Sequence, residues 1–247
     1  MKIRNKITNT YPIAFHLSGK KRWNKTGYEI YNQFINNNDV YKTEKLRSDT
    51  KIIFPHYGYS EPPMVEKSLH KLKVDNTNIA EEYLSEEIDI TSFFSYRWKM
   101  LSDWSKKNSD VKYIIGQDAS DIFFVEHPNR IVEIFENEFQ CDALFNAEKR
   151  CWPKQLRPKY NELYATKNFK HNPTVKFLNA GLFIAKTEFM PKLFDIILKT
   201  PILQDNTDQG QIHQVYLDNY PQIKVDSECR VFQHTGRVDP TIFEIEI

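Results

Sequence analysis

The sequence has little of several features that would indicate a simple class of protein. Its 247 residues include 3 Cys and 7 Gly, and no apolar run reaches the ~18 residues needed to span a bilayer. The three cysteines are odd in number and show no C-x-x-C spacing, which argues against a disulfide framework and a structural zinc site. Residues 1–23 contain no apolar segment of signal-peptide length. We therefore expect a cytoplasmic protein without a membrane span.

The chain also lacks an excess of charge of either sign. Its 34 Lys and Arg residues against 33 Asp and Glu residues leave a net charge of +1. No overall field would draw the protein onto nucleic acid or an anionic membrane, so we expect no nucleic-acid partner. A hydrophobic content of 40% is enough for the core of one large domain. The composition predicts a single domain over residues 1–247.

Short apolar runs alternate with segments of helical periodicity along the chain. Strands are predicted at residues 12–15, 51–57, 111–118, 142–148 and 176–185, and helices at 62–72, 92–107, 129–139, 188–198 and 207–220. Residues 24–50 read as a weak helix followed by a polar connector. This alternation predicts an α/β fold in which helices flank a mixed, largely parallel sheet.

The residues with the clearest chemical potential follow one of these strands. In the segment "YIIGQDASDIFF", an apolar run delivers Asp118 and Asp121 into a tight turn. Ligands of α/β sheets bind at the carboxyl ends of strands, and two carboxylates three residues apart can share a divalent cation that bridges phosphate oxygens. The alternative is an Asp-rich turn in which Asp118 accepts hydrogen bonds from the backbone. Spacing alone does not decide between them.

Further motifs follow in a recognisable order. The segments "LFNAEKRCWP", "KFLNAGLFIA", "DNTDQGQIHQVYLD" and "CRVFQ" come after the two aspartates, and "SYRWKMLSDW" precedes them. Together they resemble the glycosyltransferase domain of the procollagen lysyl hydroxylase and collagen glycosyltransferase family. Its pattern runs D-x-x-D, F-S-A-E with C-W-P, F-L-N-S-G-G-F-I-G, D-D-Q-L-F and R-I-F-Q. The resemblance covers roughly residues 50–233. It implies a GT-A (Rossmann-like) fold and Mn²⁺-dependent transfer of glucose or galactose from a UDP-sugar to a hydroxyl acceptor.

The family's third metal ligand is a His in a P-I-V-V-H-G-N-G segment at the end of the domain. Here the segment "IRNKITNTYPIAFHLSG", residues 3–19, resembles that terminal segment. The order implies a circular permutation: residues 1–48 would be the displaced terminal segment, 49–233 the core, and 234–247 a C-terminal strand or tail. The resemblance then implies metal ligation by His16 with Asp118 and Asp121. The alternatives are a structural role for His16 and ligation by His234.

The resemblance also implies roles around the donor. Phe54, Pro55 and His56 would line the uracil and ribose pocket, with ordinary core packing as the alternative for Phe54. Arg97 would reach the diphosphate, and Trp98 would belong to the core. The remaining donor-binding positions are Ser120 in the Asp turn and Gly19, Lys20, Lys21 and Arg22 after His16.

On the acceptor side, Trp152 would form a wall of the acceptor site. Asp208 would position or deprotonate the acceptor hydroxyl, and Glu148 would hold a sugar hydroxyl or order its loop. The other residues expected to be catalytic are Asn179 and Gln209. The acceptor itself stays open between a glycan and a hydroxylysine or galactosyl-hydroxylysine of a collagen-like protein.

Three positions depart from the family pattern. Leu182 replaces the second Gly of N-S-G-G, Thr207 replaces an Asp, and Ser120 replaces an aromatic residue. These departures favour an alternative function, a catalytically idle module that binds sugar nucleotides. A further alternative, from the Asp pair alone, is a metal-dependent phosphoesterase or nucleotidyltransferase.

Overall fold

The structure is a computed structural model, and it describes residues 1–18, 24–54, 61–74, 79–81, 90–166, 175–203 and 208–246. Within these ranges, the side chains of residues 79–81, 90–96 and 117 are left aside. The strands are β1 (Lys2–Asn5), β2 (Ala14–His16), β3 (Thr50–Phe54), β4 (Ile79–Glu81), β5 (Tyr113–Gln117), β6 (Ile122–Phe124), β7 (Ala143–Glu148), β8 (Phe177–Lys186), β9 (Ile223–Asp226), β10 (Phe232–His234) and β11 (Phe243–Glu246). The α-helices are α1 (Lys25–Asn36), α2 (Met64–Lys71), α3 (Ile90–Lys107), α4 (Asn129–Ile134), α5 (Arg157–Thr166), α6 (Met190–Lys199) and α7 (Asp208–Asp218).

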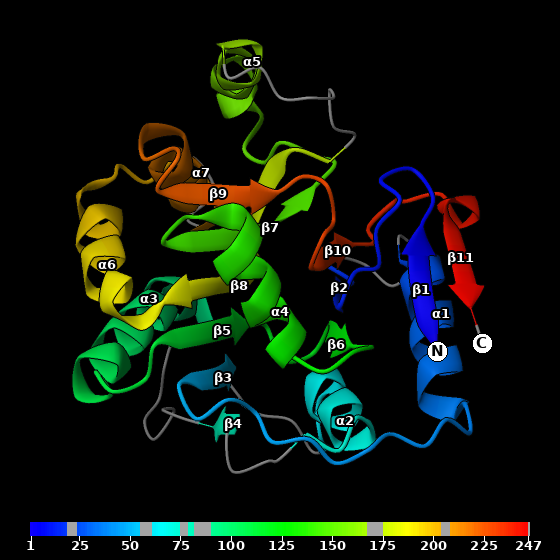
Figure 1. The fold of residues 1–247 in the computed structure, drawn as a ribbon. Coiled ribbons are helices and arrows are strands. Elements are labelled where there is room, and N and C mark those ends of the chain that lie inside the picture. Colours follow the sequence, from blue (N-terminus) through cyan, green and yellow to red (C-terminus); the bar gives the residue numbers. More distant parts are fainter. Residues whose placement is uncertain are drawn as a thin grey trace.

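A six-stranded sheet organises the molecule, in the order β4-β3-β5-β8-β7-β9. Its strand pairs are parallel except those of β8, which runs antiparallel to both β5 and β7. All residues of β8 except Lys186 are buried, as expected of a central strand covered on both faces. Helices α3 and α6 pack side by side against this sheet (Figure 1). The predicted mixed α/β fold is confirmed.

A second sheet of three strands, in the order β10-β2-β6, lies beside the first. Its central strand β2 runs parallel to β10 and antiparallel to β6. All three residues of β2 are buried. The N-terminal part of the chain is therefore built into the middle of this sheet, between segments that are more than a hundred residues away in sequence.

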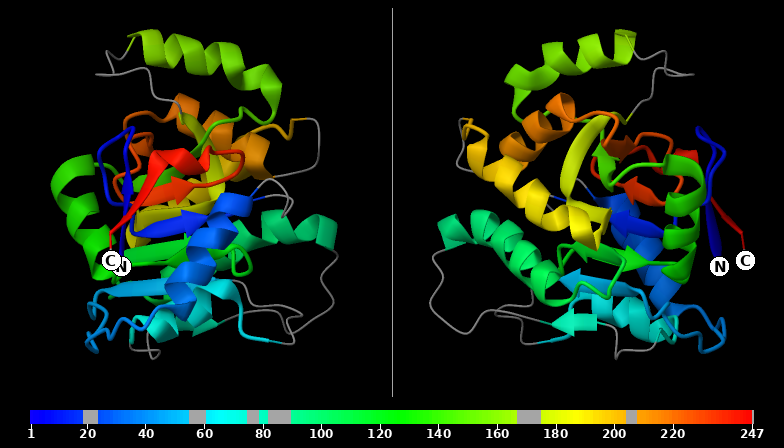
Figure 2. Two further views of the ribbon diagram at one scale, coloured as in Figure 1. Left: turned by 90° about the vertical axis from the view of Figure 1, so that its right-hand side faces the viewer. Right: turned by 60° about the vertical axis from the view of Figure 1, so that its left-hand side comes forward.

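The two ends of the described chain form an antiparallel ribbon. Strand β1 pairs with β11 in a register that sets Lys2 opposite Glu246. The ends lie next to each other in the view of Figure 1 and after rotation in Figure 2. The ribbon contributes Ile3 to the main hydrophobic core, together with Phe15 and Phe123 of the three-stranded sheet.

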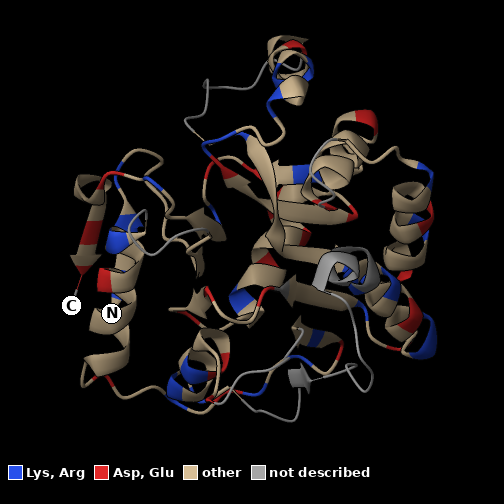
Figure 3. Ribbon diagram, turned by 180° about the vertical axis from the view of Figure 1, so that it is seen from behind, with Lys and Arg blue, Asp and Glu red and all other residues tan. Residues whose placement is uncertain are grey.

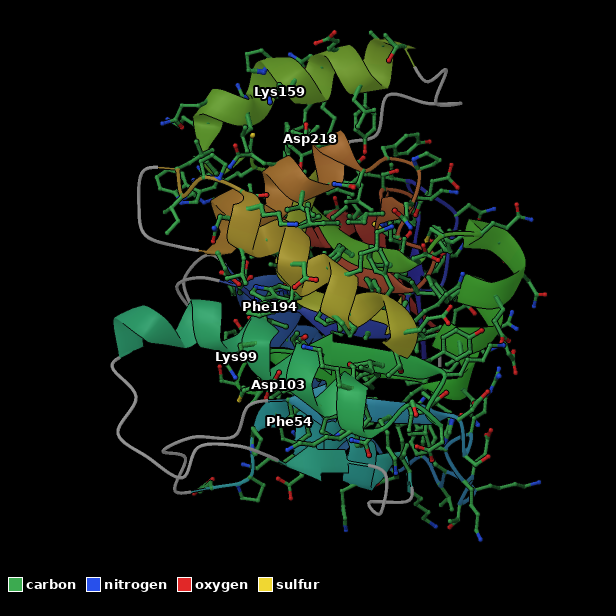
Figure 4. The ribbon with its side chains drawn as sticks, turned by 90° about the vertical axis from the view of Figure 1, so that its left-hand side faces the viewer. Phe54, Lys99, Asp103, Lys159, Phe194 and Asp218 are labelled. Atoms are coloured by element: carbon green, nitrogen blue, oxygen red, sulfur yellow. The ribbon has the colours of Figure 1, made fainter. Side chains whose placement is uncertain are left out.

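Helix α3 shows how the sequence divides between core and surface. Trp98 and Leu101 are buried, and the Trp98 ring lies 5.5 Å from the Phe183 ring of β8. On the solvent side, Lys99 and Asp103 lie one turn apart and form an ion pair of 2.5 Å (Figure 4). Figure 3 shows Lys and Arg interspersed with Asp and Glu over the fold, in keeping with the small net charge.

Some predicted elements differ from the structure. The predicted helix over residues 129–139 is divided, because α4 continues as a π-helical turn over Phe135–Phe139 that ends at Gln140 in the left-handed region (φ 47°). Helix α5 was not predicted, because its apolar periodicity is weak and one residue, Tyr160, is buried. Among the helices that the structure describes, none combines the length and hydropathy needed to cross a membrane.

Candidate active site

Three strand ends bring His16, Asp118 and Asp121 together. Asp118 follows β5, and its N–H donates to the carbonyl of Gly181 on the neighbouring β8 (2.8 Å). Asp121 immediately precedes β6, and the antiparallel pairing of β6 with β2 sets His16 opposite Ile122. The N–H of residue 17 donates to the Asp121 carbonyl at 2.8 Å, which fixes this register. Backbone pairing alone therefore places the imidazole beside the Asp turn.

The side chains of this cluster are arranged as ligands would be. His16 Nε2 lies 3.6 Å from Asp121 Oδ2 and 4.0 Å from Asp118 Oδ2. One potential ligand atom from each residue lies within 4.8 Å of the others. His16 Nε2 and Asp121 Oδ1 are buried, and neither has a hydrogen-bond partner among the described residues. One imidazole nitrogen with two carboxylates is a donor set that suits a divalent cation, so the residues present fit a metal ion.

The electrostatics of the cluster favour a bound cation. Burial lowers the pKa of His16, but the nearby carboxylates of Asp121 and Asp118 outweigh it, and the pKa lies above its ordinary value. The site therefore draws positive charge toward the imidazole. A bound divalent ion would balance the negative charge of the same two carboxylates, with His16 neutral and acting as a ligand.

Gly181 has no side chain, and this leaves room for the side chains of His16 and Asp118. A Cβ at this position would lie 2.5 Å from Asp118 Oδ2 and 2.5 Å from His16 Cε1, which is closer than van der Waals contact allows. The neighbouring Leu182, which replaces a Gly of the family pattern, is fully buried in the core. The glycine that matters for the cluster is therefore Gly181.

Arg97 on α3 lies between two carboxylates. Its Nη1 donates to Asp118 Oδ1 at 2.7 Å, and its Nη2 donates to Asp208 Oδ2 at 2.6 Å. Asp208 Oδ2 also accepts from Trp98 Nε1 at 2.8 Å, and Asp208 is 5% exposed. In this arrangement Asp208 anchors Arg97, and Arg97 orients Asp118. Arg97 is expected at the diphosphate and Asp208 at the acceptor; in the structure the two residues form an ion pair next to Asp118.

Glu148, Asn179 and Gln209 form a connected group at the end of β7. Asn179 Nδ2 and Gln209 Nε2 donate to Glu148 Oε1 at 3.3 and 3.1 Å. The backbone N–H of Ala180 donates to Gln209 Oε1 at 3.0 Å and so fixes the orientation of that amide. Burial raises the pKa of Glu148 to about 7, although the Asn179 hydrogen bond and the nearby His16 lower it. Glu148 can therefore gain or release a proton near neutral pH.

His213, a residue not singled out in the sequence, supports this group. Its Nε2 lies 3.0 Å from Gln209 Nε2, and its Nδ1 lies 2.9 Å from the Tyr160 hydroxyl. Burial lowers the pKa of His213 to about 3, which keeps it neutral. In the sequence, the signal for this contact is that His213 follows Gln209 by four residues within one helix.

His234, the alternative metal ligand, uses both ring nitrogens elsewhere. Its Nδ1 accepts from the N–H of Gly236 at 3.2 Å, and its Nε2 contacts the Ser18 hydroxyl. Burial, with a smaller contribution from the charge on His16, lowers the pKa of His234 to about 3. The structure thus places a neutral His234 beside the cluster, with its ring 5.6 Å from that of His16.

A pocket of about 420 Å³ opens beside these residues. Glu148, Gln209, His234 and Trp152 are among the residues that line it. Trp152 is 49% exposed, as a wall for a bound sugar or peptide would be. Lys149, Arg150 and Arg237 add positive charge to the lining. The pocket thus joins the predicted acceptor wall to the carboxylate with the raised pKa.

The other predicted positions divide into three groups. Phe54 is fully buried and belongs to the main core, which favours the core alternative for that residue. Ser120 is exposed in the Asp turn. Pro55 and His56, together with Gly19, Lys20, Lys21 and Arg22, lie outside the described residues.

The mixed sheet, with an Asp-x-x-Asp turn at the end of a parallel strand and a pocket beside it, is a GT-A-like glycosyltransferase architecture. The family model described as "PLOD GT domain" matches residues 71–242. The chain therefore belongs to the PLOD GT domain family. The match includes Asp118, Asp121 and the Glu148 group but begins after His16.

A curated relative gives the same indication. The chain is 26% identical over 175 residues to the "Multifunctional procollagen lysine hydroxylase and glycosyltransferase" of Caenorhabditis elegans. The similarity covers 68% of this chain and 22% of the relative, so the chain corresponds to about a fifth of that longer protein.

Proposed function

We propose that the protein transfers a hexose, glucose or galactose, from a UDP-sugar to a hydroxyl acceptor with the aid of a divalent cation, Mn²⁺ in the first instance. The observation that carries the proposal is the convergence of His16, Asp118 and Asp121, with one potential ligand atom of each within 4.8 Å of the others. Family membership supports the glycosyltransferase chemistry. His16 Nε2 is buried and has no hydrogen-bond partner among the described residues, which supports ligation from the N-terminal strand.

Each residue of the cluster has a part in this proposal. His16, Asp118 and Asp121 would hold the cation, which when bound would act as a Lewis acid on the departing diphosphate. Arg97 orients Asp118 through the 2.7 Å hydrogen bond, and its second ion pair to Asp208 holds the guanidinium in place. The positions after His16, Gly19 to Arg22, are proposed to contact the diphosphate. Pro55 and His56 are proposed to line the uracil and ribose pocket, and Ser120 is proposed as a further donor-binding position.

Glu148 is the residue we propose to act on the acceptor. It lines the pocket with Trp152, and Oε1 is held by two amides while Oε2 lies 4.0 Å from His234 Nε2. A carboxylate with a pKa of about 7 can hold the acceptor hydroxyl and take its proton near neutral pH. Asp208, ion-paired and 5% exposed, is less suited to that role. The name of the relative suggests a procollagen-like acceptor, and a glycan remains the other candidate.

The direct test is UDP release from UDP-glucose and UDP-galactose, each with Mn²⁺ and with a chelator. We expect Mn²⁺-dependent release that an Asp121→Asn variant lacks. A change in melting temperature without turnover would favour an idle binding module. Release of UMP or phosphate instead of UDP would overturn the proposal in favour of phosphoester chemistry.

We further propose that the chain is a circular permutation of the family's order. The register of the terminal ribbon supports this proposal, because Lys2 lies opposite Glu246 and two residues would close the ribbon as a hairpin. Strand β2 also occupies a central place in a sheet whose other strands come much later in the chain.

Reversal of the permutation is the experiment. A variant would replace residues 247 and 1 by an Asn-Gly turn and open the chain between residues 37 and 49. We expect it to fold with unchanged Mn²⁺ affinity. An aggregated product, or a folded one that no longer binds Mn²⁺, would count against the permutation.

A further inference from the structure

Asn146 lies behind His16 and is buried without full hydrogen bonding. It sits on β7, where the pairing with β8 shifts register between residues 145 and 146, and its exposure is 0%. Its Nδ2 lies 3.5 Å from His16 Nδ1. Its Oδ1 is buried and has no hydrogen-bond partner among the described residues. A buried amide that leaves its acceptor oxygen unpaired costs about 1 to 3 kcal/mol, so the arrangement calls for an explanation.

A metal ion at the cluster would change what His16 requires from Asn146. As a ligand through Nε2, a neutral imidazole carries its hydrogen on Nδ1, and that N–H needs an acceptor. In the arrangement described, Asn146 offers Nδ1 a donor instead. Rotation of the amide by 180° exchanges two groups of nearly equal size and brings Oδ1 against Nδ1–H. Oδ1 then accepts from Nδ1–H, Nδ2 takes the place that Oδ1 had, and the lone pair of Nε2 is left for the metal.

We infer that Asn146 is a positioning residue that sets the tautomer of His16. It donates to Nδ1 when Nε2 carries the hydrogen, and it accepts from Nδ1–H when Nε2 binds a metal ion. The inference rests on the proposed role of His16 as a ligand. Within the described part of the chain, Asn146 is the one side chain seen to hydrogen-bond His16 Nδ1. The family pattern given above has Ser at this position, so the amide is a feature of this chain.

The test compares Asn146→Leu, which has a similar volume but no hydrogen bonding, with Asn146→Asp, which can only accept. Mn²⁺ affinity is measured by calorimetry. The tautomer of His16 is read from ¹⁵N NMR of the imidazole with Zn²⁺ as a diamagnetic probe. We expect the Leu variant to bind Mn²⁺ roughly 10- to 100-fold more weakly, the usual effect of losing a partner of a ligating His. The Asp variant should retain binding, and its zinc complex should show a strongly hydrogen-bonded Nδ1–H.

Two controls separate the possible failures. Ser102→Ala removes a buried hydroxyl that has no hydrogen-bond partner within the described ranges, and it should leave Mn²⁺ affinity unchanged. Leu and Asp variants that both bind Mn²⁺ within about two-fold of the original protein, with His16 in the same tautomer, would overturn the role of Asn146. His16→Ala that still binds Mn²⁺ normally would overturn the proposed ligand set itself, and the inference with it. If the Leu variant does not fold, the NMR signature of the Asp variant still decides.

Discussion

Two clusters of charged side chains, one around Arg47 and one around Asp118, differ in how many of their polar atoms have hydrogen-bond partners. Arg47 donates to both oxygens of Asp49 and to both oxygens of Glu136. Tyr113 and Lys112 donate to Glu136 as well, at 2.7 and 3.3 Å. The Arg47 hydrogen bonds are the main reason that the pKa of Glu136 falls to about 2.

The cluster around Asp118 has the opposite character. Arg97 satisfies one oxygen of Asp118, but His16 Nε2 and Asp121 Oδ1 are buried without hydrogen-bond partners in the described part of the chain. The two sites have similar residue types, yet the Arg47 cluster is complete by itself and the Asp118 cluster is not. Charged groups that satisfy one another hold a fold together, whereas the adjacent imidazole and carboxylates of the Asp118 cluster form the site that we propose to bind a metal ion.

The largest effect expected from this contrast is the loss of metal binding in Asp121→Asn. Removal of one carboxylate ligand should weaken Mn²⁺ binding by about 1,000-fold, more than the loss of a partner behind a ligand. The melting temperature without metal should change little, because Asp121 is not part of the hydrophobic core. Calorimetry and thermal melts measure both. Mn²⁺ affinity equal to that of the original protein would remove the distinction between the two clusters.

Glu148→Gln should give the next largest effect, seen in stability against pH. The folded-state pKa of Glu148, about 7, lies above the unfolded value of 4.5, so ionisation inside the fold destabilises it. Stability from this group is complete below pH 4.5 and is lost as the pH rises through 7. The Gln variant should therefore gain at most about 3 kcal/mol at pH 8 and almost nothing at pH 4. Urea unfolding at both pH values tests this, and a pH-independent difference would contradict it.

A smaller effect is expected from Gly181→Ala. The added Cβ would press on Asp118 and His16, so Mn²⁺ affinity should fall about 10-fold and stability by about 1 to 3 kcal/mol. Gly116→Ala is the matched control, because its Cβ would meet the ring of Phe183 instead. It should lower stability without a specific loss of Mn²⁺ affinity. Equal losses of affinity in the two variants would indicate general damage to the fold.

The smallest effect should come from the cluster around Arg47. Glu136→Gln should cost about 1 kcal/mol at pH 7, since the ion pairs are partly exposed and screened by solvent. Stability from the lowered pKa is present above pH 4.5 and is lost as the pH falls toward 2, so the difference should vanish in acid. Mn²⁺ affinity should be unchanged. A loss of metal binding in this variant would show that the two clusters are coupled.

The sequence predicted the α/β alternation well because buried strands and amphipathic helices differ in their apolar period. It also indicated the Asp118 turn, whose two carboxylates are close in sequence. It was less informative where partners are distant. The ion pairs of Arg97 with Asp118 and Asp208 join residues 21 and 111 positions apart, and no local pattern reports them.

By itself, the sequence determined which residue types lie at the strand ends and that the chain carries the family's motifs in order, since these depend on local pattern. The tertiary structure decided which groups act together. It placed His16 against Asp121 through the pairing of β2 with β6. It paired Asp208 with Arg97, and it brought Glu148 and Trp152 to one pocket. Burial depends on contacts from the whole fold, so the raised pKa of Glu148 and the burial of Asn146 behind His16 could be found only in three dimensions.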